Sequence, residues 1–386
     1  MRAQDQQVVT GAEIKKTEKR SRMYDVVSIG GATVDIFIRT SDSRIISIRE
    51  PKYRTEFLAF DYGHKIYVDD VIYSPGGGGN NTAVAFARLG LLTAFIGCIG
   101  QDEEGRRLLM SLKTEGIRTD FITRTSEQNT GLSIVLNSFE GDRTCFSYRG
   151  ANNSLTRESI DWDELKKTKW LYIPSLSGAS HDLLPELVAF AQKHKIQIAC
   201  NPGNQQLDLG LEGLDFLIKA CSILNINKEE AERLTGMRAA HRTVDESVCH
   251  LETMGGEPWV SDVREMLVTL HNRGAQVVVI TEGIKGAQVF DGEQFYWMPV
   301  YPYKPTDTLG AGDAFAASFV AGMITEKGIK QSLKIAAANS SHVVQKFGAQ
   351  PGLATMQQIE TLINKHSTIQ PLAESVDNLQ RSLSWG

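Results

Sequence analysis

The chain has 386 residues, a formal net charge of −5 and 41% hydrophobic residues. This length can bury a substantial core, and the weakly acidic balance offers no basic surface for nucleic acid. No apolar run reaches the roughly 18 residues that a membrane-spanning helix needs, so we expect neither nucleic acid nor a membrane as a partner.

The two ends of the chain differ from its middle. Residues 1–23 are polar and charged without the apolar stretch of a secretory signal, and they are predicted to be a disordered leader. The folded domain is expected over 24–366, followed by a tail at 367–386 that is also predicted to be disordered. The five cysteines are widely spaced and form no CxxC pair, which is typical of reduced thiols in a cytoplasmic protein. Cys249 and His250 have no partners at zinc-ligand spacing, so no structural zinc site is expected.

Short apolar runs alternate with helical patterns along most of the chain. The predicted strands are Asp25–Ile29, Thr93–Ile99, Trp170–Ile173, Ile196–Cys200, Ser222–Ile226 and Val277–Thr281. The predicted helices repeat apolar residues every three or four positions and are Glu103–Glu115, Leu183–His194 and Val260–Arg273. This alternation predicts an α/β fold with a doubly wound, mostly parallel sheet flanked by helices. Polar residues that follow strands or open helices should converge at the carboxyl ends of the strands, namely Asp35, Asn81, Asn201, Asn227, Thr281 and Asp313.

Two stretches, at about 37–75 and 128–150, interrupt this alternation. The first contains strand-like segments without a helix: Arg44–Ile48, Phe57–Phe60 and Lys65–Val68. The second resembles a hairpin, Leu132–Asn137 and Thr144–Tyr148, around the turn Glu140-Gly141-Asp142. A small β-sheet lid beside a catalytic site would exclude water. A surface sheet without a role is the alternative, but proximity to Asp35 and to the glycine run favours a lid.

Four consecutive glycines, Gly76 to Gly79, come shortly before Asn81 and an apolar helical pattern. Glycine in an ordered element costs entropy without burying a side chain, so packing does not explain the run. A flexible loop is the alternative, but a loop need not lead straight into an amphipathic helix and an apolar strand. We therefore predict that Gly77, Gly78 and Asn81 bind a substrate.

The segment Asp307–Phe315, DTLGAGDAF, is the most informative motif of the chain. Gly310, Ala311 and Gly312 allow main-chain N–H groups to converge on an anion at a helix N-terminus. Asp313 would be a poor neighbour for a phosphate unless it orients and deprotonates an attacking hydroxyl, so it is predicted to be a catalytic base. A capped helix after a glycine turn is the alternative, and this motif alone does not decide. The helix N-terminus is expected to keep the pKa of Asp313 low.

Gly30-Gly31 follows the first predicted strand, which raises the alternative of a dinucleotide-binding enzyme. No G-x-G-x-x-G follows that strand, and this absence argues against such an enzyme.

Four ordered motifs resemble the PfkB, or ribokinase-like, family of carbohydrate and nucleoside kinases over roughly Tyr24 to His366. The first runs from the glycine run through A-R-L-G to Gly105, and DTLGAGDAF is the last. Asn227-x-x-Glu230 and Thr281-x-Gly283 lie between them, and Ser318 stands where the family usually has Gly or Ala. The resemblance implies a ribokinase-like fold with a small β-sheet lid. It also implies an ATP-dependent phosphotransferase that phosphorylates a hydroxymethyl group of a ribose- or fructose-like sugar.

The resemblance further implies roles for individual residues. Asp313 would be the base, Gly310 to Gly312 the anion hole, and Asp35 an acceptor of hydrogen bonds from sugar hydroxyls. Asn227 and Glu230 match a pair that organises a hydrated Mg²⁺, although Asn-x-x-Glu is also a helix-capping signature. The implied nucleotide contacts are Thr281, Gly283, Gly286 and Asn339. Asp307 and the loop Phe347-Gly348-Ala349 match a monovalent cation site found in some members, so potassium is also an expected cofactor.

Several alternatives stay open at this point. A nucleoside is the alternative acceptor, and a catalytically silent sugar-binding regulatory protein is the alternative from another class. Retention of Asp313 behind intact glycines argues against the silent protein, because a binder needs no base. The edges of the lid sheet offer a homodimer contact, as in some relatives.

Overall fold

The computed structural model describes residues 24–49, 54–137, 143–243 and 259–376. The predicted leader, the turn Glu140-Gly141-Asp142, Cys249, His250 and residues 377–386 lie outside the described residues. Among the described residues, no helix combines the length and the apolar character needed to span a bilayer.

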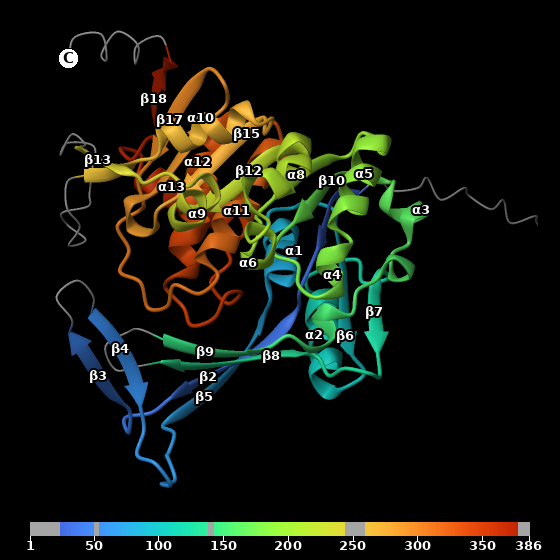
Figure 1. Cartoon of the computed structure of the whole chain (residues 1–386), viewed down its shortest axis with the longest axis vertical. Coiled ribbons are helices and arrows are strands. Elements are labelled where there is room, and N and C mark those ends of the chain that lie inside the picture. Colours follow the sequence, from blue (N-terminus) through green and yellow to red (C-terminus); the bar gives the residue numbers. More distant parts are fainter. Residues whose placement is uncertain (1–23, 50–53, 138–142, 244–258, 377–386) are drawn as a thin grey trace, which may run out of the picture.

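A ten-stranded sheet forms the centre of the molecule, in the order β18-β17-β16-β15-β12-β11-β10-β1-β6-β7 (Figure 1). Its strands are β1 (Tyr24–Ile29), β6 (Thr93–Gly100), β7 (Ile122–Thr125), β10 (Thr168–Ile173), β11 (Gln197–Cys200), β12 (Cys221–Asn227), β15 (Val277–Thr281), β16 (Ala287–Phe290), β17 (Gln294–Met298) and β18 (Leu372–Ser375). Every neighbouring pair from β15 to β7 is parallel, and β16, β17 and β18 add antiparallel strands at one edge. Continuous apolar strands such as β15, with the sequence VVVIT, suit a sheet that is buried on both faces. The predicted fold class is confirmed.

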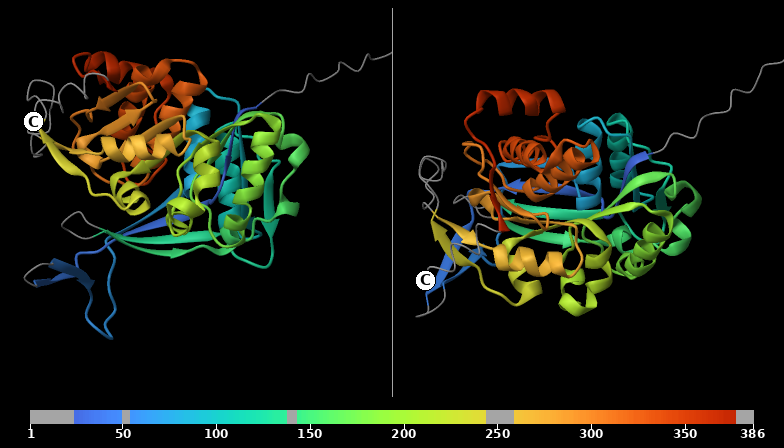
Figure 2. Two further views of the ribbon diagram at one scale, coloured as in Figure 1. Left: turned by 45° about the horizontal axis from the view of Figure 1, so that its top comes forward. Right: turned by 90° about the horizontal axis from the view of Figure 1, so that it is seen from above.

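Helices cover both faces of this sheet (Figure 2). A separate apolar core lies beneath each layer of helices. One layer contains α1 (Gly78–Arg88), α2 (Glu103–Thr114), α11 (Ala311–Ile324), α12 (Gly328–Val343) and α13 (Met356–Lys365). The other contains α3 (Trp162–Leu165), α4 (Ala179–Asp182), α5 (Leu184–His194), α6 (Asn204–Leu207), α7 (Gly210–Gly213), α8 (Asp215–Ala220), α9 (Lys228–Thr235) and α10 (Arg264–Asn272). The glycine run and DTLGAGDAF open α1 and α11, which belong to the same layer and contact each other.

The predicted lid is a four-stranded sheet in the order β5-β2-β8-β9, which projects from the core in Figure 1. Its strands are β2 (Thr33–Arg39), β5 (Asp70–Gly76), β8 (Gly131–Asn137) and β9 (Arg143–Tyr148). A separate hairpin, β3 (Arg44–Arg49) with β4 (Arg54–Ala59), extends further out. A second small pair joins β13 (Ala240–Thr243) to β14 (Trp259–Asp262).

Three predicted segments were wrong. The helix predicted from Val260 begins at Arg264, because Trp259–Asp262 pairs with β13 instead. Lys65–Val68 is not a strand, since pairing with β2 selects Asp70–Gly76. The tail is ordered in part, because Leu372–Ser375 pairs with β17 as an edge strand.

Candidate active site

The glycine run makes a sharp turn between the lid and the core. Strand β5 ends at Gly76 and α1 begins at Gly78, with Gly77 at a φ of 90° between them. A Cβ on Gly77 would lie 2.6 Å from the main-chain oxygen of Gly31, so both the dihedral angle and the close approach require glycine. A Cβ on Gly78 would lie 3.6 Å from Oδ1 of Asp313. The two glycine turns therefore face the same space.

Asn81 and Asp313 join these turns directly. Nδ2 of Asn81, in the first turn of α1, donates a hydrogen bond of 2.8 Å to Oδ2 of Asp313. Asp313 lies in the first turn of α11. Gly310, which immediately precedes this helix, has a φ of 78°. A Cβ on Gly312 would meet no heavy atom within 4 Å, so this glycine borders open space. The unpaired N–H groups of a first helical turn and their positive dipole make this space suited to an anion.

Burial controls the charge of the two carboxylates near the turns. Desolvation raises the pKa of Asp313, and the negative charge of Asp35 raises it further. The hydrogen bond from Asn81 lowers this pKa but does not cancel the effect of burial. Desolvation also raises the pKa of Asp35, which is 5% exposed, against hydrogen bonds from Thr33 and Ser133. The expected low pKa of Asp313 was wrong, because desolvation by burial is the largest influence on this carboxyl group.

Asp35 lies within the lid rather than at the end of the first strand. Strand β1 stops at Ile29, and Asp35 is the third residue of β2. Its partners along the neighbouring strands are Ser74 on β5 and Ser133 on β8. Movement of the lid therefore also moves Asp35.

A cavity of about 140 Å³ lies on the other side of the α11 turn. It is lined by the predicted nucleotide contacts Thr281, Gly283 and Gly286 and also by Ala311 and Gly312. The structure thus brings the turn after β15 and the turn at 310–312 together around one space.

Asn339 does not line this cavity. Its side chain is fully buried, where it donates to Oγ of Ser318 over 2.8 Å and accepts from the main-chain N–H of Ala354 over 2.9 Å. The predicted nucleotide contact of Asn339 therefore finds no support in this cavity. The side chain of Asn339 faces α11, whereas the next residue, Ser340, lines the cavity. The unusual Ser318 is explained by the same hydrogen bond.

Asn227 and Glu230 form a capping box at the start of α9. Each side chain accepts the other's main-chain N–H, over 2.8 and 2.9 Å. Burial raises the pKa of Glu230, so a nearby cation would stabilise its ionised form. Within the described part of the chain, no three His, Cys, Asp or Glu side chains are grouped to hold a metal ion. One carboxylate and one amide oxygen are chemically sufficient to hold the waters of a hydrated divalent cation.

Asp307 organises the loop that follows α12. It is 8% exposed, and its two carboxylate oxygens accept from the N–H groups of Leu309 and Gly348, both over 3.0 Å. The guanidinium of Arg39, at the end of β2, lies 5.0 Å from the ring centroid of Phe347. A Cβ on Gly348 would lie 2.6 Å from Oγ of Ser74. The loop at 347–349 therefore touches both the segment at 307–310 and the lid.

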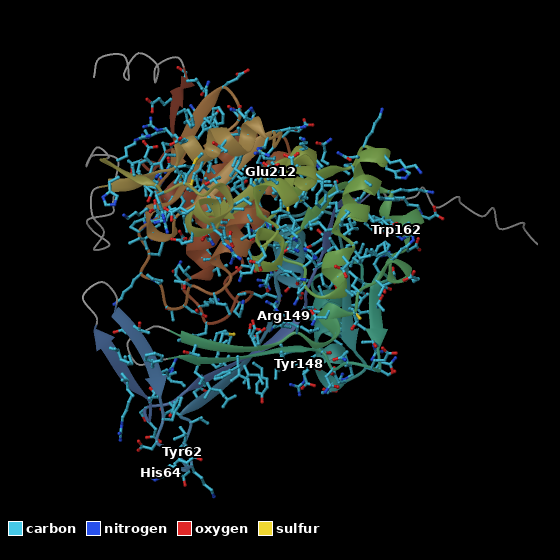
Figure 3. All side chains as sticks on the ribbon, viewed as in Figure 1. Tyr62, His64, Tyr148, Arg149, Trp162 and Glu212 are labelled. Carbon is cyan, nitrogen blue, oxygen red and sulfur yellow. The ribbon has the colours of Figure 1, made fainter. Side chains whose placement is uncertain are left out.

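Sequence reasoning missed two buried amides that hold the site. Asn152 accepts from the N–H of Ala32 over 2.8 Å and donates to its carbonyl over 2.9 Å, which fixes the start of the lid. In the sequence, Asn152 could have been noticed as an amide directly after Gly150 and Ala151, where the hairpin returns to the core. Figure 3 labels Arg149, which marks this part of the chain. The second amide, Gln350, donates to Asn81 over 3.1 Å. It directly follows the loop at 347–349 in the sequence.

Comparison with known proteins gives the family and the fold of the chain. A family model described as pfkB family carbohydrate kinase matches residues 45–356. Ribokinase of Bacillus subtilis is 27% identical over 344 residues, covering 89% of this chain and 100% of the relative. The structure of Arabidopsis thaliana ribokinase complexed with ribose and ATP has a TM-score of 0.67 at 22% identity, covering 89% of this chain and 99% of that one. A putative ribokinase II from E. coli, in complex with ATP and Mg²⁺, has a TM-score of 0.69 at 20% identity, covering 89% and 100%.

Proposed function

Because the chain belongs to the pfkB family of carbohydrate kinases, we propose that it transfers the γ-phosphoryl group of ATP to a hydroxymethyl group of a ribose- or fructose-like sugar. The family gives the reaction class, a phosphotransferase with an alcohol group as acceptor. The observation that supports the proposal most is the 2.8 Å hydrogen bond between Asn81 and Asp313. Because this bond joins the two glycine turns, it supports one shared site in which donor and acceptor would meet.

Asp313 is the proposed base. Its carboxylate accepts the proton of the attacking hydroxyl and aligns that hydroxyl with the phosphorus atom. Burial raises the pKa of Asp313, which makes it a stronger base than an exposed aspartate. Phosphoryl transfer passes through a loose transition state, so much of the rate comes from alignment.

Gly310, Ala311 and Gly312 form the proposed anion hole. The start of α11 directs main-chain N–H groups toward the space beside Gly312. The cavity lined by Thr281, Gly283 and Gly286 ends at this turn, so a nucleotide bound there would present its terminal phosphate to it. Charge that develops on the phosphoryl oxygens would then meet preorganised donors.

The acceptor site is proposed on the lid side of the turn. Asp35 would accept hydrogen bonds from vicinal sugar hydroxyls, and Gly77, Gly78 and Asn81 would line the rest of the pocket. The lid strands would cover the sugar and exclude water, which competes as a phosphoryl acceptor. A nucleoside remains the alternative acceptor, because its ribose offers a similar hydroxymethyl group.

Two cations are part of the proposal. Asn227 and Glu230 would hold the waters of Mg²⁺, and the chemistry that this ion supplies when bound is neutralisation of phosphate charge. The bound ATP and Mg²⁺ in the E. coli neighbour support these cofactors. Asp307 and the carbonyls of the loop at 347–349 would hold K⁺. Equal rates in potassium and tetramethylammonium salts would contradict this last site.

The lid also supports a proposed homodimer. In the pairing register, Ile36 lies beside Tyr73 on β5 and in one row with Ile134 and Phe146, on the face opposite Asp35. Tyr73 and Phe146 are 58% and 59% exposed, which leaves an apolar sheet face uncovered. A second copy of the chain would cover it. A monomeric mass in sedimentation equilibrium at micromolar concentration would contradict the dimer.

The proposed location is the cytoplasm. Cys98, Cys200 and Cys221 are buried thiols without a disulfide, which fits a reducing compartment. Transport of the protein to an oxidising compartment, seen by cell fractionation, would contradict this location.

The test of the function is a panel of sugars and nucleosides incubated with ATP and Mg²⁺ and scored by ADP release. We expect ribose- or fructose-like sugars to give the highest kcat/KM. Asp313→Asn is the control for contaminating kinases. ADP release that no member of the panel stimulates above this control would contradict the proposed function.

A further inference from the structure

A buried chain of amide groups ends at Asp313. Gln350 is 4% exposed, and its Nε2 donates to Oδ1 of Asn81 over 3.1 Å. Asn81 in turn donates from Nδ2 to Oδ2 of Asp313 over 2.8 Å. A side-chain amide has one donating and one accepting end. The two contacts therefore agree on a single orientation of Asn81, in which its NH₂ group faces the carboxylate.

The opposite orientation would be unfavourable at both ends. Oδ1 of Asn81 would then face the carboxylate of Asp313, and the two NH₂ groups of Asn81 and Gln350 would face each other. An unpaired buried donor or acceptor costs about 1–3 kcal/mol. When Asp313 is protonated, its carboxyl group can donate as well as accept, so it does not fix the orientation of the Asn81 amide. Gln350 still fixes that orientation.

Gln350 is itself held from outside the site. Nη1 of Arg88, in the ARLG motif of α1, donates to the main-chain oxygens of Gln350 over 2.9 Å and of Leu353 over 2.8 Å. Arg88 also forms an ion pair of 2.6 Å with Glu115. The loop carrying Gln350 is therefore fixed to the helix that carries Asn81, which gives the ARLG motif a physical role.

We propose that Gln350 is a positioning residue that fixes the side-chain amide of Asn81 with its NH₂ group toward Asp313. The proposal deepens the proposed function, on which it rests for the role of Asp313 as base. Gln350 does not line the nucleotide cavity, and its side chain reaches Asp313 through Asn81.

Several charged and titratable groups around Asp313 influence the ionisation of its carboxyl group. Asp35 on β2 raises the pKa of Asp313 by its negative charge, and the phenol of Tyr172 on β10 is close enough to interact with the same carboxylate. From α1 the group that faces Asp313 is the neutral amide of Asn81. From α12, Ser340 contributes a hydroxyl that donates to the carbonyl of Ala311. The NH₂ group of Asn81 is thus the neighbour that favours the ionised base.

Gln350→Glu tests the proposal because it keeps the shape and replaces a donor by an ionisable acceptor. At high pH the new carboxylate would compete with Asp313 for the NH₂ group of Asn81. At low pH its protonated form would donate to Asn81 again. We expect kcat to fall about tenfold or more on the alkaline side and to recover as the pH is lowered, with a KM for ATP within about twofold of wild type.

Two further variants separate positioning from packing. Gln350→Met removes the donor at similar volume and should lower kcat by a similar factor across the pH range, without an alkaline loss. Gln288→Glu is the matched control, because Gln288 is a buried glutamine that donates to the main-chain oxygen of Ser261 over 2.6 Å. It should lower the melting temperature without an alkaline loss of kcat.

A second measurement does not depend on turnover. The NH₂ resonances of Asn81 in ¹⁵N–¹H spectra, assigned by their loss in Asn81→Asp, should shift as Asp313 titrates in the wild type. In Gln350→Glu they should respond to two carboxyl groups. A pH profile of Gln350→Glu parallel to wild type, together with unchanged Asn81 resonances, would overturn the proposal. If the wild type phosphorylates no acceptor, the proposed function fails and these spectra still decide the role of Gln350.

Discussion

The amide of Asn81 donates to the carboxylate of Asp313 over 2.8 Å, although 232 positions separate them in the sequence. Each residue belongs to a glycine turn that alone would also fit a simple capped helix. Their contact shows that the two turns lie side by side, with Asp35 close enough to influence the charge of Asp313. The catalytic interpretation of both turns depends on this meeting.

Asp313→Asn should abolish turnover. The amide cannot accept the hydroxyl proton, so we expect kcat to fall at least about 100-fold, or roughly 2.7 kcal/mol of barrier. Binding of a non-hydrolysable ATP analogue, measured by calorimetry, should stay within a few-fold, because the anion turn is made of main-chain groups. Retention of more than about a tenth of the wild-type kcat, roughly 1.4 kcal/mol, would rule out Asp313 as the base.

The same substitution should stabilise the fold at neutral pH. An aspartate whose pKa is raised on folding favours the folded state below its unfolded pKa, and this contribution is lost as the pH rises through the folded pKa. Desolvation raises the pKa of Asp313, so its ionised form weakens the folded state at pH 7. Asp313→Asn should therefore raise the melting temperature at pH 7 and lose this advantage toward pH 4. Asp182→Asn, at a side chain that is 83% exposed, is the control and should change neither value. A lower melting temperature of Asp313→Asn at pH 7 would show that burial is not its dominant constraint.

Gly310 and Gly312 should respond differently to alanine. A Cβ on Gly310 would lie 2.4 Å from Cβ of Ala349 at a φ of 78°, so Gly310→Ala should destabilise the fold by about 1–3 kcal/mol. A Cβ on Gly312 would meet no heavy atom within 4 Å. Gly312→Ala should keep the melting temperature and raise the KM for ATP or lower kcat, because the methyl group would project into the space of the phosphate. Thermal melts and steady-state kinetics of the pair test this contrast. Equal kinetics of wild type and Gly312→Ala would place the phosphate elsewhere.

The sequence predicts well those features that depend only on residues close together in the chain. The strand Val277–Thr281 is recognisable because a parallel strand buried on both faces is continuously apolar. By contrast, residues 260–262 in β14 were predicted as the start of a helix, because nothing local in this segment reveals its pairing with β13. Asn339 was predicted to contact the nucleotide because it is polar, but polarity does not reveal which side of a helix faces another helix. The partner of Asn339 is Ser318 on α11.

The electrostatics of the candidate site needed the three-dimensional structure. A helix terminus visible in the sequence suggested a low pKa for Asp313, but desolvation depends on everything that packs around it. Gln350 was likewise unreadable, since its partner Asn81 is 269 positions away.

Asp102 connects the lid to the core and provides a test of that connection. Its carboxylate caps α2 by accepting from the N–H of Gly105 over 2.8 Å, and it accepts from the N–H and hydroxyl of Thr130 over 2.7 and 2.5 Å. Thr130 comes directly before β8, so these bonds fix one root of the lid. Asp102→Ala should cost about 1–3 kcal/mol of stability and raise the KM for the sugar more than the KM for ATP, because Asp35 moves with the lid.

Asp161→Ala is the matched control for this prediction. Asp161 caps α3 by accepting from the N–H of Glu164 over 3.0 Å, on the opposite layer from α2. Its loss should cost about 1 kcal/mol and leave both KM values unchanged. If Asp102→Ala and Asp161→Ala lower the melting temperature alike and neither changes the KM for the sugar, Asp102 acts only as a helix cap. A selective rise for Asp102→Ala would instead show that the position of the lid, and with it the grip on the sugar, depends on a carboxylate outside the cleft.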